Sequence, residues 1–226
     1  MLLFSFLSQG DIVFFPQEEL PNESIVPQLD SPQAVTARKI SFTKRWEPLI
    51  AYGWLLDEPF YKSDYVAAGL TYSWSEFYGV TARYMSWAEG LSNYANQFAS
   101  TAASLRFERG YGPSSGYSLS FNQRLFYGKI SFSKNLITPI TLTTIYEGGI
   151  INYGGRGFPF GGAGIINAWY FTKNWSFDIG LKLFIRQALD PLSADLRSIA
   201  PTPKVSDFNV TNRFSTNLDL GFQYIF

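Results

Sequence analysis

The stretch Phe214–Phe226, FSTNLDLGFQYIF, alternates between apolar and polar residues along its length and ends on an aromatic residue. Side chains of a β-strand point to opposite faces in turn, so the stretch predicts a strand with one apolar and one polar face. Ile225 is the one apolar residue on the polar face. Lipid covers such an apolar face when a sheet closes into a barrel with its polar side inward. The stretch therefore predicts a strand of a bacterial outer-membrane β-barrel.

The composition of the chain excludes several classes of protein. Among its 226 residues there is no cysteine and no histidine, which excludes Ser–His–Asp and Cys–His catalytic triads and cysteine-based metal sites. The 18 basic residues balance the 18 acidic ones, so there is no basic excess to favour nucleic acid as a partner. No apolar run approaches the roughly 18 residues of a membrane helix. We expect no enzymatic activity, no catalytic residue, no metal and no cofactor.

Residues 1–44 are predicted to form an extended N-terminal tail on the periplasmic side, because prolines and acidic residues recur there and few residues can be buried. Met1–Leu7, MLLFSFL, is similar to the apolar part of an export signal. No basic residue precedes it and no clear cleavage site follows, so a degraded signal and an ordinary tail both remain open.

Residues 45–226 are predicted to form the barrel. Alternating segments of about ten residues, the length of a tilted membrane-spanning strand, recur along this part of the chain. We expect eight of them. They are Trp46–Leu56, Tyr65–Ser75, Tyr78–Trp87, Tyr117–Leu125, Ile140–Gly148, Gly162–Phe171, Trp175–Arg186 and Phe214–Phe226.

The connections between these segments alternate between short and long, as expected for an even-stranded barrel with both termini in the periplasm. Short turns are predicted at Ser75–Phe77 and Thr172–Asn174, and an intermediate link at 126–139. The glycine-rich stretch Gly149–Gly161 is predicted to be a long flexible loop. Two further strand-like stretches, 103–108 and 128–133, leave ten strands as the alternative, and 95–109 can also be read as a short helix in a loop.

The chain resembles a family of small outer-membrane β-barrel proteins from gliding and predatory Gram-negative bacteria. The resemblance lies in Leu56-Asp57-Glu58-Pro59-Phe60 after the first strand, in Tyr127-Gly128-Lys129, and in the aromatic C-terminus. It covers the chain from about residue 36 onward and implies an outer-membrane barrel. Some members resemble components of envelope or surface-motility assemblies. This chain departs from the family in lacking a clear export signal.

The polar face of the predicted strands carries charged residues that would lie inside the barrel. An eight-stranded barrel is just wide enough to be filled by side chains, so these charges are expected to pair as a plug. The alternative is the lining of a pore. The residues are Arg83, Arg124, Glu147, Asp178, Lys182, Arg186 and Asp219.

The apolar face of the last two strands is predicted to contact lipid. Its residues are Phe177, Ile179, Leu181, Leu183, Leu218, Leu220, Phe222, Tyr224 and Phe226. Five aromatic residues fall on predicted outer loops, where they would form either a docking surface or the upper aromatic girdle. They are Phe60, Tyr61, Tyr153, Phe158 and Phe160.

The function expected from these features is that of a structural or interaction protein of the cell envelope, acting as a scaffold, in adhesion or in a motility complex. Its predicted partners are outer-membrane lipid and other envelope proteins, contacted through the loops or the tail. A porin-like channel for small solutes is the alternative, and it needs ten or more strands or an unblocked lumen. A soluble lipocalin-like barrel is a further alternative, with its apolar residues inside.

Overall fold

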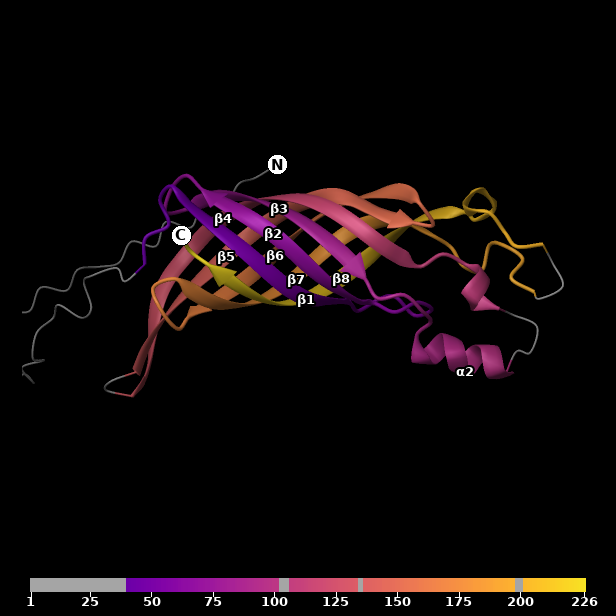
Figure 1. Ribbon diagram of the computed structural model, residues 1–226, viewed down its shortest axis with the longest axis horizontal. Coiled ribbons are helices and arrows are strands. Elements are labelled where there is room, and N and C mark those ends of the chain that lie inside the picture. Colours follow the sequence, from indigo (N-terminus) through magenta and orange to yellow (C-terminus); the bar gives the residue numbers. More distant parts are fainter. Residues whose placement is uncertain (1–39, 102–105, 134–135, 198–200) are drawn as a thin grey trace, which may run out of the picture. The chain divides into compact units, whose positions relative to one another are not determined.

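The computed structural model describes residues 40–101, 106–133, 136–197 and 201–226. They form a closed barrel of eight antiparallel strands in sequence order, with β1 paired to β8 (Figure 1). The prediction of eight strands is confirmed. The strands are β1 (Arg45–Leu55), β2 (Asp64–Ser73), β3 (Tyr78–Trp87), β4 (Pro113–Ser133), β5 (Leu136–Tyr153), β6 (Arg156–Tyr170), β7 (Trp175–Leu189) and β8 (Val210–Tyr224).

Three short helices lie in the connections: α2 (Asn93–Thr101), η2 (Phe107–Arg109) and η3 (Val205–Asp207). None of the helices among the described residues is long and apolar enough to cross a bilayer. Residues 1–39 of the predicted tail and most of the strand-like stretch 103–108 lie outside the described residues. The described end of that stretch belongs to η2 and not to a strand.

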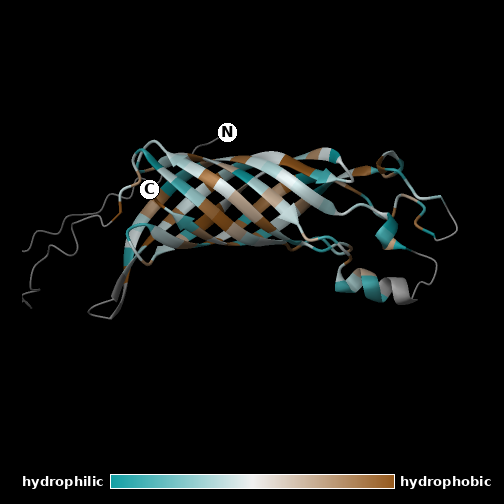
Figure 2. Cartoon of the chain, in the orientation of Figure 1, coloured by the Kyte–Doolittle hydropathy of each residue, from teal (hydrophilic) through white to brown (hydrophobic). Residues whose placement is uncertain are grey.

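The wall of the barrel has an apolar outer face. Its inner face carries the buried charged residues of the strands, and apolar residues toward the loop end. Along β7, Leu181 and Leu183 are 45% and 58% exposed, whereas Lys182 between them is 3% exposed. Apolar and polar residues alternate in the same way along the other strands (Figure 2). A soluble barrel has the reverse arrangement, because water surrounds it. The chain is therefore a transmembrane β-barrel, and the lipocalin-like alternative is wrong.

The two ends of the barrel differ in their connections. The short-turn end holds the β2–β3 turn, the β6–β7 turn, the start of β1 and the end of β8 (Figure 1). In the β2–β3 turn, Ser75 Oγ accepts hydrogen bonds from the amides of Phe77 and Tyr78. In the β6–β7 turn, Thr172 Oγ1 accepts hydrogen bonds from the amides of Asn174 and Trp175. Such hydroxyl contacts stabilise tight turns. The opposite end, called the loop end here, holds the connections 56–63, 88–112, 154–155 and 190–209.

The glycine-rich stretch was predicted as a long flexible hairpin loop, and its length is a correction to the sequence analysis, since most of the stretch belongs to the two strands. Strands β5 and β6 are joined by Gly154 and Gly155 alone, with φ of +55° and +84°. Two-residue hairpin turns require such positive φ values. Other glycines of the stretch lie in the wall, and at Gly149 an aromatic side chain and a neighbouring backbone leave no space for a Cβ. A Cβ on Gly149 would lie 2.8 Å from the ring of Phe160.

The intermediate link at 126–139 is also mostly strand. Strands β4 and β5 stay paired as far as Ser133 and Leu136, beyond the end of the β3–β4 ladder at Gln123. They therefore project from the short-turn end as a two-stranded ribbon (Figure 1). A register shift between Arg124 and Phe126 marks the point where the ribbon begins. The stretch 128–133 thus continues β4 and adds no ninth strand.

Candidate functional site

The seven charged residues predicted for the inner face all lie on strands and are buried or half-buried in the barrel wall. Six of them form ion pairs with described residues, arranged at three levels along the lumen. Asp178 forms none among the described residues. The charges are therefore neutralised side chain against side chain, as the plug interpretation requires.

The middle level is a network of two bases and two acids. Lys182 Nζ lies 2.9 Å from Glu147 Oε2 and 2.7 Å from Asp219 Oδ2. Arg83 Nη1 lies 2.8 Å from the same Asp219 oxygen, and the hydroxyl of Tyr65 donates to its other oxygen. These groups come from β2, β3, β5, β7 and β8, so the network spans the lumen. Removing one partner would leave a charge buried without compensation.

The lower level, nearer the short turns, is centred on Glu47 of β1. Arg124 Nη2 donates to both carboxylate oxygens of Glu47, at 2.7 and 2.9 Å. Ser73 Oγ and Gln223 Nε2 also donate to this carboxylate. Glu47 is 1% exposed, so its charge is fully enclosed by donors.

The upper level is centred on Arg186, which has no exposed surface. Its Nη2 lies 2.8 Å from Glu58 Oε2 and 3.3 Å from Asp57 Oδ2. Its Nε donates to Ser215 Oγ at 2.6 Å, and its Nη1 donates to the hydroxyl of Tyr153. This level ties the β1–β2 loop to the inside of the barrel.

Three of the acidic partners were missed in the sequence analysis. Glu47 has the same strand parity as Ala51 and the opposite parity to the apolar residues Ile50 and Tyr52, so the alternation contained the signal for it. Asp57 and Glu58 gave no such signal, because they follow the end of β1 and were assigned to an outer loop. They bend into the barrel mouth and neutralise Arg186.

Between the lower and middle levels lies a chamber of about 60 Å³. Asp178 lines it and accepts one hydrogen bond among the described residues, from Ser176 Oγ at 2.8 Å. The Nη1 of Arg124, which also lines the chamber, is buried without a hydrogen-bond partner. Its other polar lining residues are Glu47, Thr71, Thr81, Arg83, Ser120, Asn122, Thr141, Thr143, Tyr170, Asp219 and Gln223, and apolar residues such as Leu49 and Ile166 complete the lining.

The short-turn end of the lumen is closed by a segment that precedes the barrel wall. Ile40–Thr43 was assigned to the tail, yet Phe42 is completely buried and its ring lies 4.0 Å from the guanidinium carbon of Arg124. Phe42 also packs on Tyr170, with ring centroids 5.8 Å apart. Ile225, the apolar exception on the polar face of β8, belongs to the same cluster. Its side chain points inward to complete this floor.

Glu76, in the β2–β3 turn, fastens the floor. Its Oε1 accepts hydrogen bonds from Ser41 Oγ, the amides of Phe42 and Thr43, and Thr43 Oγ1, at 2.7 to 3.2 Å. Partial burial pushes the pKa of Glu76 upward, but these hydrogen bonds outweigh it and lower the pKa below its ordinary value. The carboxylate therefore stays ionised while it holds the segment.

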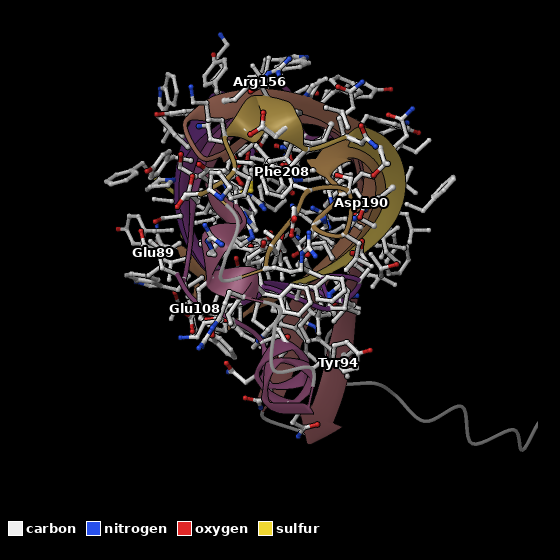
Figure 3. The ribbon with its side chains drawn as sticks, turned by 90° about the vertical axis from the view of Figure 1, so that its right-hand side faces the viewer. Glu89, Tyr94, Glu108, Arg156, Asp190 and Phe208 are labelled. Atoms are coloured by element: carbon white, nitrogen blue, oxygen red, sulfur yellow. The ribbon has the colours of Figure 1, made fainter. Side chains whose placement is uncertain are left out.

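The loop end of the lumen is closed by an apolar cluster. Phe107, Leu196 and Phe208 come from the loops and pack onto residues of the upper wall. In the view onto this end, Phe208 lies near the centre of the barrel outline and Arg156 at its edge (Figure 3). This cluster, called the roof here, covers the upper ion pairs from the loop end.

The predicted aromatic docking surface is wrong, because four of its five residues are buried and Phe60 packs against the roof. Tyr61, Tyr153, Phe158 and Phe160 are at most 8% exposed. Phe60 is half-buried and stacks on Phe107 at 4.9 Å. They are not part of an outer girdle either. Three of them lie on β5 and β6, which extend further than expected and turn these rings into the lumen.

The predicted lipid-facing residues lie on the outer face of β7 and β8 or just after it. Leu181 and Leu183 are exposed, and Leu218 and Leu220 are half-exposed beside them. Tyr224 lies between Trp175 and Phe226, with ring centroids 4.9 and 4.8 Å away. Aromatic residues in such a row mark a membrane–water boundary.

The described residues contain no group of three or more acidic side chains that could hold a metal ion. No model of a known protein family matches the chain, and a search of curated proteins finds no match. The solved structures that are similar to this chain include two at 11% identity. A de novo designed transmembrane β-barrel gives a TM-score of 0.37, covering 81% of this chain and 97% of that one. The crystal structure of Neisserial surface protein A gives a TM-score of 0.38, and the match covers 80% of this chain and 96% of that one.

Proposed function

We propose that the chain is an outer-membrane β-barrel of a Gram-negative bacterium that serves as a structural or interaction protein of the envelope. The observation that carries this proposal is the filled lumen. Ion pairs occupy three levels, and a floor and a roof cover the two ends. A solute channel needs a continuous water path, and an eight-stranded barrel filled in this way has none.

In this function the barrel anchors the loops at the cell surface, with the short-turn end in the periplasm. The connections 88–112 and 190–209 are the longest, and Tyr94 and Leu192 expose 55% and 62% of their surface there. These exposed residues replace the predicted aromatic surface as the contact region for other envelope proteins. Lipid is the partner of the outer wall.

Recording from planar bilayers tests whether the barrel is a channel. We expect no steady conductance at neutral pH. Stable open channels of uniform size from the pure protein would overturn the proposal and favour the channel alternative.

Labelling of single cysteines in intact cells tests location and orientation, because the chain has no cysteine of its own. A membrane-impermeant thiol reagent should label Tyr94→Cys in intact cells and Lys173→Cys only after lysis. Lys173 is exposed in the β6–β7 turn at the opposite end and is the matched control. Labelling of Lys173→Cys but not of Tyr94→Cys in intact cells would contradict the orientation.

A further inference from the structure

The chamber between the lower and middle ion pairs has hydrogen-bonding capacity that the described protein atoms do not meet. Arg124 is 8% exposed, and its Nη1 has donors without acceptors. Asp178 has a carboxylate with one neutral donor and no base in contact among the described residues. Unpaired polar groups in an enclosed space are costly, and internal water commonly satisfies them. A volume of about 60 Å³ has room for a few water molecules.

The chamber is walled by strands and covered from below by a segment that is not part of a strand. Phe42 lies against Arg124 and Tyr170, both of which line the chamber. The carboxylate of Glu76 holds this segment from a turn. No strand ladder would break if Ile40–Thr43 moved away, since β1 begins at Arg45.

We propose that the chamber binds water in its closed form, and that Ile40–Thr43 is a displaceable cover through which small polar molecules reach it from the short-turn end. Water suits the site because one molecule donates to Asp178 and accepts from Arg124. Above the chamber, the network of Arg83, Lys182 and Asp219 stays closed when the cover opens. The site is thus a compartment with one entrance, and it goes beyond the proposed function without requiring a channel.

Thiol reactivity tests the entrance. Thr143→Cys places the chain's one thiol in the chamber wall, and ethylammonium methanethiosulfonate is the probe. The protein is folded in detergent, and folding of each variant is checked by its heat-dependent migration on gels. We compare Thr143→Cys alone with the same variant carrying Phe42→Ala or Glu76→Gln. Because local opening controls access, we expect labelling about tenfold faster with Phe42→Ala and a smaller acceleration with Glu76→Gln.

Phe208→Ala is the matched control, since it removes an aromatic residue from the roof and leaves the floor intact. It should leave the labelling rate of Thr143→Cys unchanged. Equal rates in all four proteins would overturn the proposed entrance. An acceleration by Phe208→Ala as large as that by Phe42→Ala would overturn it too, because the route would then lead through the loops. If Phe42→Ala does not fold, the comparison of Glu76→Gln with Phe208→Ala decides.

Nuclear magnetic resonance tests the bound water. Long-lived water in the chamber should give Overhauser cross-peaks between water and the methyl groups of Thr141 and Thr143, which line it. The methyl group of Ile151, buried in the apolar cluster of the loop end, is the control without such a peak. Absence of the threonine cross-peaks would overturn the hydrated chamber. Bilayer recordings of Phe42→Ala should remain silent, because the middle level still blocks the lumen.

Discussion

A new charge on the lipid-facing side of β7 or β8 meets hydrocarbon, whereas a new charge on the inner side meets counter-charges. Leu181→Arg and Leu220→Arg each place a cation on the outer face near the middle of a strand, and we expect a loss of roughly 2–4 kcal/mol in the free energy of unfolding. Gln223→Arg should lose less, since Gln223 lines the chamber beside Glu47 and Asp178. Unfolding titrations in lipid vesicles measure this difference. Equal losses at all three positions would contradict the assignment of faces.

The lower ion pair gives a residue-scale test of how charge is held in the lumen. Glu47→Leu leaves Arg124 buried without its partner, and we expect it to destabilise the barrel by about 3–5 kcal/mol. The double variant Glu47→Leu, Arg124→Met should recover most of this loss, because a buried pair replaced by apolar residues is often neutral. The same vesicle titrations serve as the measurement. A double variant no better than the single one would show that the pair itself is not the source of the loss.

The hydrogen bonds from Ile40–Thr43 to the carboxylate of Glu76 make the floor sensitive to acid. The pKa of Glu76 is lower in the folded protein than in the unfolded chain, so its stabilising effect is present above the unfolded pKa and is lost as pH falls through the folded pKa. We expect the amide resonances of Phe42 and Thr43, which donate to Glu76, to shift in acid below its ordinary pKa. In Glu76→Gln, the same resonances should not titrate over that range. A titration that persists in this variant would assign the effect to another group.

At the scale of elements, the alternation of apolar and polar residues predicted the strands well where neither bulges nor clustered glycines interrupt it. Predicted Tyr78–Trp87 matches β3, and predicted Trp46–Leu56 differs from β1 by one residue at each end. The extension of β5 and β6 to a two-residue turn was missed because glycine and proline usually indicate loops. In this wall, glycines instead make room for Phe160 and Phe184. The glycine and the aromatic side chain that fills the space above it lie on neighbouring strands, so the periodicity within one strand does not reveal the pairing.

In the candidate site, too, the residues on regular strands were predictable from the sequence and those on loops were not. Strand parity identified the basic residues at all three levels and two of their acidic partners, Glu147 and Asp219. It did not identify Asp57 and Glu58, because a loop that folds back into the barrel mouth has no alternation. The floor was missed for the same reason, since Ile40–Thr43 is irregular and its contacts with Glu76 and Arg124 are distant in sequence.

The turn between β5 and β6 gives a test at the scale of an element. Gly155→Ala should cost roughly 1–2 kcal/mol, because its φ is +84° but its Cβ would meet no atom within 4 Å. Gly154→Ala should cost more, since its φ is also positive and its Cβ would lie 2.4 Å from the ring of Tyr111. Unfolding titrations in lipid vesicles measure which of the two variants loses more free energy of unfolding. A larger loss for Gly155→Ala would contradict the turn geometry.

At the scale of the whole molecule, the apolar outer face requires an amphiphile. Ile50, Leu119 and Phe214 expose 62%, 59% and 79% of their surface on three separate strands, and an apolar area of this extent is not stable in water. We expect the purified protein to aggregate in plain buffer and to be monodisperse in detergent micelles, as measured by light scattering. A compact monomer in buffer without detergent would contradict the transmembrane assignment.

An interior occupied by side chains lets each copy of the protein add surface loops to a membrane without adding a leak. The number of copies that a cell carries is then not limited by the loss of ion gradients or small metabolites. An open pore of the same width would impose that limit as copies accumulate. In the proposed outer-membrane location, the permeability barrier would therefore stay intact even where this barrel is densely inserted.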